Sequence, residues 1–252
     1  MENNIKYQTP EISRYFSENR VSWQQFYLSE RVIIEQLALG ATQQVLDIGC
    51  GCGGLGLALR ERFGVINYTG VEINPAAAQA GADLNPNAHI ICGDILEVGR
   101  AELSERQFDA VFSLSCVDWN VRFQDMLSAA WGYVRPGGSL ISTFRLTNGE
   151  SCTEFEKSYQ FINFKGELQG ERAAYVVLNC RALLQQLDAF DSLEINAYGY
   201  WGAPSASAVT PYKQLCFAAF SIRKRREGET GRMVLKMDLP KEILDSCDRR
   251  PQ

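Results

Sequence analysis

The chain has 252 residues, a hydrophobic content of 46% and a formal net charge of −5. This length suits one large α/β domain or a domain with an inserted cap, and the hydrophobic content is ample for a core. The acidic balance argues against a surface built for nucleic-acid phosphates or anionic lipid. No apolar run reaches the length of a membrane span and residues 1–4 do not begin a signal peptide, so we expect a cytoplasmic protein.

Eight cysteines are scattered along the chain and include no C-x-x-C pair. Zinc sites and disulfide frameworks both depend on regular cysteine spacings. We therefore expect no metal site and reduced thiols.

A glycine-dense turn organises the first half of the chain. Val45–Ile48 predicts an apolar strand, a helix pattern starts at Leu55, and glycines crowd the residues between them. Glycine permits positive φ angles and lets a ligand lie against bare backbone. A helix that begins there points its free N–H groups at the ligand. The turn therefore predicts a nucleotide-like ligand, and a glycine-rich turn without a ligand is the alternative.

Carboxylates stand at the ends of three successive predicted strands. Asp47 lies in the end of the first strand, Glu72 ends the second and Asp94 ends the third. Parallel strands joined by helices present their C-terminal ends to one side, so these carboxylates should meet near the glycine turn. Glu72 is about 20 residues past the turn, where a carboxylate can accept both hydroxyls of a ribose. An exposed strand-end glutamate without a role is the alternative.

In this order the motifs resemble those of the class I S-adenosylmethionine (AdoMet)-dependent methyltransferases. The features that carry the resemblance are the run Asp47-x-Gly49-x-Gly51-x-Gly53, the strand-end Glu72, the pair Gly93-Asp94, and Pro136-Gly137-Gly138 before an apolar strand. The resemblance covers roughly residues 43–145 well and the last two strands loosely. It implies an α/β, Rossmann-like fold, with a seven-stranded, mostly parallel sheet, helices on both faces and an antiparallel last strand.

The same resemblance implies AdoMet as the cofactor and S-adenosylhomocysteine as its product. It assigns the adenine amine to Asp94 and the adenine ring to Ile95, while Asp47 can accept bonds from a cationic group. The expected cofactor-binding residues are Asp47, Gly49, Cys50, Gly51, Gly53, Glu72, Ile73, Asp94, Ile95 and Ser113.

Before the first strand, residues 14–39 predict one or two helices, with Phe16, Trp23 and Tyr27 near one face. Such a stripe most often packs against its own sheet. The resemblance implies a different role, a helical lid over the cofactor, and the candidates to approach its methionine part are Tyr7, Arg14, Tyr15 and Arg20. We expect this lid at 1–40, a methyltransferase domain at 41–222 with a substrate-cap insertion at 147–178, and a charged C-terminal tail at 223–252.

The acceptor side is less defined. The loop after the fourth strand contains Cys116 and Asp118, and it departs from the Asn-Pro-Pro-Tyr pattern of enzymes that methylate adenine or glutamine amides. The lone histidine, His89, should lie roughly 16 Å from the cofactor side, at the far end of its strand. The candidates for catalysis are Asp118 and Glu150. The candidates for substrate binding are Trp119, Tyr198, Tyr200 and Trp201.

The sequence therefore predicts direct, in-line methyl transfer to the oxygen or nitrogen of a small molecule. A sulfonium methyl is already electrophilic, so positioning suffices and no metal is required. We expect no nucleic-acid or membrane partner. A non-catalytic AdoMet-binding protein and an NAD(P)-dependent oxidoreductase stay open as alternatives. The acceptor, the general base, the pathway and the oligomeric state are not set by the sequence.

Overall fold

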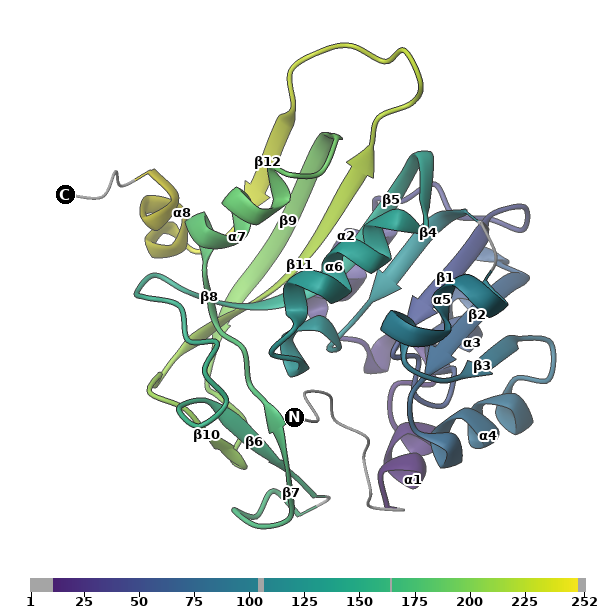
Figure 1. Ribbon diagram of the computed structural model, residues 1–252, viewed down its shortest axis with the longest axis horizontal. Coiled ribbons are helices and arrows are strands. Elements are labelled where there is room, and N and C mark those ends of the chain that lie inside the picture. Colours follow the sequence, from purple (N-terminus) through teal and green to yellow (C-terminus); the bar gives the residue numbers. More distant parts are fainter. Residues whose placement is uncertain (1–10, 104–106, 164, 249–252) are drawn as a thin grey trace.

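The computed structural model describes residues 11–103, 107–163 and 165–248. Its centre is a nine-stranded sheet in the order β12-β9-β11-β5-β4-β1-β2-β3, with β8 paired to β5 outside this path. Helices cover both faces of the sheet, and a second sheet of three strands lies at one end (Figure 1). Among the described residues, no helix is both long and apolar enough to cross a membrane.

Five parallel strands form the half of the sheet that carries the glycine turn. They are β1 (Gln44–Ile48), β2 (Asn67–Glu72), β3 (His89–Cys92), β4 (Phe108–Ser113) and β5 (Val134–Thr147). The helices between them are α3 (Gly54–Phe63), α4 (Pro75–Leu84), α5 (Ile95–Glu102) and α6 (Phe123–Gly132). Because each connection returns to the same edge, the C-terminal ends of all five strands meet on one side.

The other half of the sheet is mixed. β11 (Leu215–Lys224) runs antiparallel to both β5 and β9 (Ser192–Gly202), and β12 (Val234–Asp238) adds an outer strand parallel to β9. The predicted Rossmann-like, mostly parallel sheet is thus confirmed. The predicted count of seven strands is too low, because β12 and the short β8 (Leu178–Asn179) extend the sheet.

The segment 223–252 is more than the charged tail that we expected. It forms β12 and α8 (Lys241–Asp248), and it buries Leu239 and Ile243 in the domain core. Its apolar residues are interleaved with charged ones along an edge strand and a short helix, so neither element gives a strong periodic signal.

Two hydrophobic clusters flank the sheet. On one face α2 (Leu28–Glu35) and α3 pack Ile33, Ile34 and Leu59 against Val45 and Phe112. The opposite face is covered by α5, α6, α7 (Cys180–Leu187) and α8. Helices on both faces let the parallel strands bury both of their sides.

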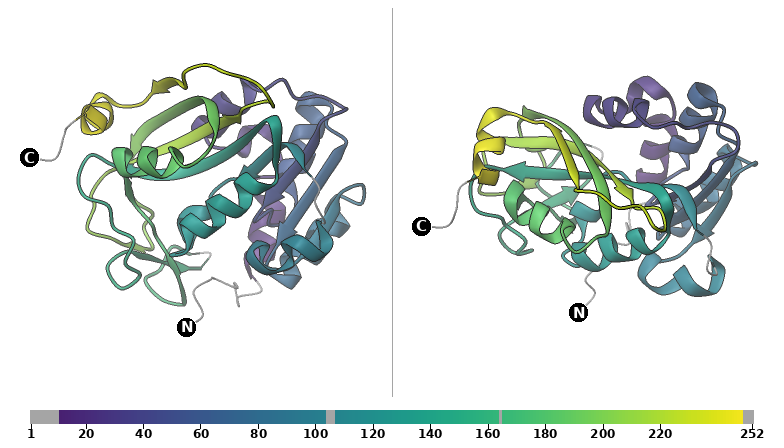
Figure 2. Two further views of the ribbon diagram at one scale, coloured as in Figure 1. Left: turned by 45° about the horizontal axis from the view of Figure 1, so that its top comes forward. Right: turned by 90° about the horizontal axis from the view of Figure 1, so that it is seen from above.

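The second sheet is built from two separate segments. β6 (Tyr159–Ile162) and β7 (Glu171–Ala174) come from the insertion after β5, and β10 (Ala208–Val209) comes from the connection between β9 and β11. We call this small sheet and its loops the cap. Figure 2 shows from two further directions that the cap lies at the end of the main sheet.

Candidate functional site

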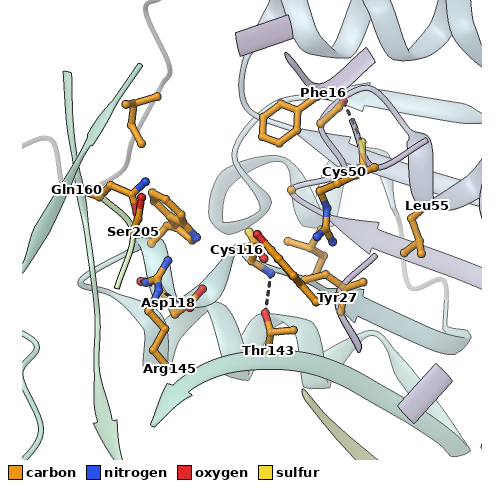
Figure 3. Close-up of a pocket in the computed structure, with 18 of the residues that line it drawn as sticks. Phe16, Tyr27, Cys50, Leu55, Cys116, Asp118, Thr143, Arg145, Gln160 and Ser205 are labelled. Carbon is orange, nitrogen blue, oxygen red and sulfur yellow. Dashed lines mark hydrogen bonds and ion pairs between the residues drawn. The ribbon is translucent and has the colours of Figure 1, made fainter. Parts of the chain in front are cut away.

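A cavity of about 690 Å³ lies at the C-terminal ends of the parallel strands. It is bounded by the glycine turn, the cap and the N-terminal segment that holds α1 (Glu11–Glu18) and the short helix η1 (Trp23–Gln25). Figure 3 shows Gln160 and Ser205 of the cap facing Phe16 and Cys50 across this space. Its size fits the range of small-molecule and cofactor sites.

The glycine turn has the backbone that its sequence predicts. Gly49, Gly51 and Gly53 have φ angles of 72°, 56° and 70°, and α3 begins at Gly54. A Cβ on Gly49 would lie 2.5 Å from the sulfur of Cys116. Glycine is therefore required both by the dihedral angles and by the close approach of the loop after β4.

Glu72 lies at the end of β2 and is bonded to this turn. One carboxylate oxygen accepts the backbone N–H of Gly51 at 2.8 Å, and the other accepts that of Asn74 at 2.8 Å. Burial raises the pKa of Glu72, and the backbone N–H groups of Asn74 and Gly51 oppose this rise. The side chain therefore fixes the turn and also lines the cavity.

Asp47 is a buried carboxylate in the floor of the cavity. It accepts a 2.6 Å hydrogen bond from the hydroxyl of Tyr68. Burial raises the pKa of Asp47 to about 7, against the opposing effects of Tyr68 and the positive charge of Arg20. Its charge therefore changes in the physiological pH range.

Most of the residues expected to bind the cofactor line the cavity. Besides Asp47 and Glu72, these are Gly49, Cys50, Gly51, Ile73, Asp94 and Ile95. Gly53 and Ser113 do not line it. Gly53 is the N-cap of α3, and Ser113 is fully buried, while Leu114 and Ser115 after it reach the cavity.

The N-terminal segment packs directly on the glycine turn. The ring of Phe16 lies 3.2 Å from the position of a Cβ on Gly51, and the carbonyl oxygen of Arg20 lies 2.1 Å from that of a Cβ on Gly54. The guanidinium of Arg20 donates to the buried carboxylate of Glu30 at 2.9 Å. A buried ion pair thus holds the backbone of this segment against the turn.

The candidates in this segment have different positions. Tyr15 and Arg20 line the cavity, whereas Arg14 lies at the surface in an ion pair with Glu18, and Tyr7 is outside the described residues. The three aromatic residues that were expected on one helix face lie in two different places. Trp23 is buried in the core beside Phe63, while Phe16 and Tyr27 line the cavity. The chain turns between α1 and α2, so these three side chains do not share one helix face.

Arg145 stands at the end of β5, on the side of the cavity that faces the cap. Its Nη1 group donates to the backbone oxygen of Asp118 at 2.8 Å and lies 3.2 Å from Oδ2 of the same residue. The guanidinium is 3.7 Å from the ring centroid of Tyr175 and 4.6 Å from that of Trp119. Two aromatic faces and one carboxylate therefore fix its orientation.

Asp118 is held by this arrangement. Burial raises the pKa of Asp118, and the charge of Arg145 opposes the rise. Its Oδ1 atom is buried and has no hydrogen-bond partner in the described part of the chain. The carboxylate thus supports Arg145 and offers little accessible surface of its own.

Only some of the other acceptor-side candidates lie in the cavity. Trp119 and Tyr200 line the cavity, whereas Tyr198, Trp201 and Glu150 do not. The indole N–H of Trp201 reaches Glu242 of α8 at 3.4 Å, so this side chain lies on the opposite side of β9 from Tyr200.

Sequence reasoning missed the side chains that complete this end of the cavity, namely Arg145, Gln160, Tyr175, Ser205 and Ser207. Arg145 could have been found, because it ends a predicted parallel strand on the same side as Asp47 and Glu72. The cap residues could not have been found, because Gln160 lies in a strand of four residues and the other three lie in loops, where no periodic pattern marks them.

Comparison with known proteins finds a related domain family. Residues 45–138 match the model of a family described as "Methyltransferase domain". The chain is 29% identical to trans-aconitate 2-methyltransferase of Deinococcus radiodurans over 61% of its length and 60% of that protein. It is 26% identical to malonyl-[acyl-carrier protein] O-methyltransferase of Brevibacillus brevis over 73% of its length and 70% of that protein.

A solved structure adds evidence on the fold alone. Phosphoethanolamine N-methyltransferase 2 of Haemonchus contortus, in complex with phosphomonomethylethanolamine and S-adenosylhomocysteine, superposes with a TM-score of 0.58. Its sequence is 14% identical, and the match covers 86% of this chain and 57% of the other. Together with the ordered motifs and the parallel sheet, the family match identifies residues 45–138 as a methyltransferase domain of the class I S-adenosylmethionine-dependent type, whose cofactor is AdoMet.

Proposed function

We propose that the protein transfers the methyl group of AdoMet, in line and without a metal, to a carboxylate oxygen of a small acidic molecule. The observation that supports this most is the fixed Arg145 in a part of the cavity whose described residues offer no available base. We call the part of the cavity that is lined by the glycine turn, Glu72 and Asp94 the cofactor half. The acceptor half is the part lined by Asp118, Arg145 and the cap.

The cofactor half can hold AdoMet through groups of matching chemistry. Asp47 faces the ammonium of the methionine part, and Glu72 accepts the ribose hydroxyls. Asp94 accepts the adenine amine, and its N-cap bond from Leu96 at 3.0 Å fixes the orientation of its carboxylate. Ile95 packs on the ring. Held through these groups, AdoMet would supply an electrophilic methyl group to a nucleophile bound in the acceptor half.

The acceptor half favours a nucleophile that is already ionised. A hydroxyl acceptor usually requires a base in the site. Asp118 is bound to Arg145, and burial raises the pKa values of Tyr27, Tyr175 and Tyr200, so these phenols stay protonated at neutral pH. His89 does not line the cavity. A carboxylate needs no base, because it is ionised at neutral pH.

Arg145 gives such an acceptor a binding group. Its Nη1 is used by Asp118, while Nε and Nη2 have no acceptor within the described residues. A guanidinium edge of this kind binds carboxylates through two parallel hydrogen bonds. The relatives named above carry the names of acids, trans-aconitate and a malonyl group. An acceptor with two carboxylates would place one on Arg145 and present the other to the methyl group.

The test separates binding of the acid from folding. Because Arg145→Gln alone leaves the buried Asp118 without its partner, we compare Asp118→Asn with the double variant Asp118→Asn, Arg145→Gln. Activity is measured as S-adenosylhomocysteine formed with trans-aconitate, malonate monoesters and citrate. Asp118→Asn keeps the bond from Arg145 to the backbone oxygen of residue 118 and both aromatic contacts, so it should retain measurable turnover and serves as the reference. The double variant should raise the KM for the acid by at least about tenfold to a hundredfold, the value of one charge-assisted hydrogen bond.

The affinity for S-adenosylhomocysteine should stay within about twofold in both variants, and Arg122→Gln, a surface arginine paired with Asp125, serves as the matched control. An unchanged KM in the double variant would remove Arg145 from acceptor binding. Tight cofactor binding without turnover on any acid or amine would favour the non-catalytic AdoMet-binding alternative.

A further inference from the structure

Two cysteines far apart in the sequence face each other at the side of the main sheet. Cys180 is the first residue of α7, and Cys247 lies in the last turn of α8. The thiol of Cys247 donates to the sulfur of Cys180 at 2.7 Å. Two non-bonded heavy atoms normally pack about 3.5–4.0 Å apart, so these two sulfur atoms are in direct contact.

The surroundings of the pair distinguish the two thiols. Cys180 is fully buried, whereas Cys247 is partly exposed to solvent. The hydrogen bond from Cys247 and burial both raise the pKa of Cys180. An oxidant from solvent therefore reaches Cys247 first, and Cys180 is in place to react with whatever forms there.

We propose that Cys180 and Cys247 form a reversible disulfide that links α8 to the start of α7 when the protein meets a low-molecular-weight disulfide such as oxidised glutathione. The thiolate of Cys247 attacks the glutathione disulfide, which releases one glutathione thiolate and leaves a mixed disulfide on Cys247. Cys180 then loses its proton and attacks the sulfur of Cys247, which releases the second glutathione. Two thiols are oxidised, one external disulfide is reduced, and the two protons pass to the two glutathione thiolates.

The disulfide would also restrain the segment that connects the cap to the core. Cys180 follows directly after β8, whose Leu178 pairs with Leu146 of β5, one residue beyond Arg145. Five residues before Cys180 is Tyr175, which stacks on the guanidinium. A covalent link from α8 to this point therefore fixes the segment that returns from the cap to the core. The inference does not depend on the proposed methyl transfer.

The bridge also closes a long loop, because β9, β11 and β12 all lie between its two ends. A disulfide that closes such a loop restricts the unfolded chain, so oxidation should raise the melting temperature. It should also slow amide hydrogen exchange in α8, which is the last described helix of the chain.

The experiment uses the full chain, reduced and then incubated with oxidised glutathione. Remaining thiols are blocked with N-ethylmaleimide, and peptides are mapped by mass spectrometry without reduction. Wild type should give a peptide pair joined through Cys180 and Cys247. Cys180→Ser should stop at a glutathione adduct on Cys247, and Cys247→Ser should leave Cys180 unmodified. Cys92→Ser is the control, because Cys92 is exposed and distant in sequence from both, and this variant should still form the bridge.

The melting temperature supplies a second readout. It should rise by several degrees on oxidation of wild type and of Cys92→Ser, and it should stay constant in Cys247→Ser, whose partly exposed position tolerates the change. A stable glutathione adduct on Cys247 of wild type, with Cys180 still a thiol, would contradict the proposal. Bridges from Cys247 to other cysteines would contradict it as well.

Discussion

Glu72 accepts the backbone N–H of Gly51 at 2.8 Å, so a carboxylate at the end of β2 holds the turn that follows β1. The cofactor half is therefore fixed before any ligand arrives. The carboxylate retains the capacity to accept a ribose hydroxyl, because a carboxylate can accept about four hydrogen bonds. One side chain can thus shape the turn and bind the cofactor.

Replacing Glu72 with Ala should weaken binding of S-adenosylhomocysteine by roughly 1–3 kcal/mol, through loss of charge-assisted hydrogen bonds. Glu72→Gln should retain part of this affinity, because its amide oxygen still accepts one bond. Isothermal titration calorimetry measures both. Glu61→Ala, an exposed position on α3, is the control and should bind as wild type does. Unchanged affinity in Glu72→Ala would exclude this carboxylate from the ribose site.

Gly54→Ala should displace the N-terminal segment from the turn. A Cβ at this position would lie 2.1 Å from the carbonyl oxygen of Arg20, which is backbone and cannot rotate away. We expect weaker cofactor binding and a change in the fluorescence of Trp23, which is buried nearby in the same segment.

Gly132→Ala is the matched control for that substitution, because a Cβ on Gly132 in α6 meets nothing within 4 Å. Alanine is also about 0.5–1 kcal/mol better than glycine inside a helix, so this variant should be as stable as wild type or slightly more stable. Equal cofactor affinity in the two alanine variants would show that the segment does not need to pack on Gly54.

The affinity for the cofactor should depend on pH through Asp47, whose pKa burial raises to about 7. In the proposed binding mode, the ammonium of the cofactor pairs with the ionised carboxylate of Asp47. Below about pH 7 the free protein carries a proton there that must leave on binding, so affinity should fall, by up to about tenfold per pH unit. Above about pH 8 it should level off. Asp47→Asn should bind more weakly at pH 8 and lose this dependence in calorimetric titrations from pH 5.5 to 8.5.

His89→Gln should leave kcat within about twofold of wild type. His89 is exposed at the first residue of β3, at the opposite end of that strand from Asp94. Steady-state kinetics with saturating AdoMet give the answer. A hundredfold loss would mean that the histidine takes part in catalysis after all.

The sequence correctly predicted that the strand-end carboxylates lie in one cavity, because the motifs that carry them are local. Each carboxylate directly ends an apolar strand, and strand ends in parallel sheets meet on one side. Asp47, Glu72 and Asp94 could therefore be brought together without knowledge of the whole fold. Ser113 was misplaced because strands alternate their faces, and a shift of one residue moves a side chain from the cavity into the core.

The acceptor half could be predicted only in part. Trp119 and Tyr200 were found as aromatic residues in loops or strand ends, but their neighbours Tyr198 and Trp201 could not be distinguished from Tyr200 without the bounds of β9. Arg145 interacts with Tyr175 from the cap and with Asp118 from another loop. Such contacts between distant segments leave no periodic trace in a single sequence.

The most direct test of the proposed function follows the methyl group itself. The protein is incubated with methyl-deuterated AdoMet and a panel of di- and tricarboxylic acids, and with amines and neutral alcohols of similar size. Products are identified by mass spectrometry before and after mild base. We predict a deuterated methyl ester of an acid that base hydrolyses back to the acid. Transfer of the label to an amine or an alcohol, with none to any acid, would contradict the account.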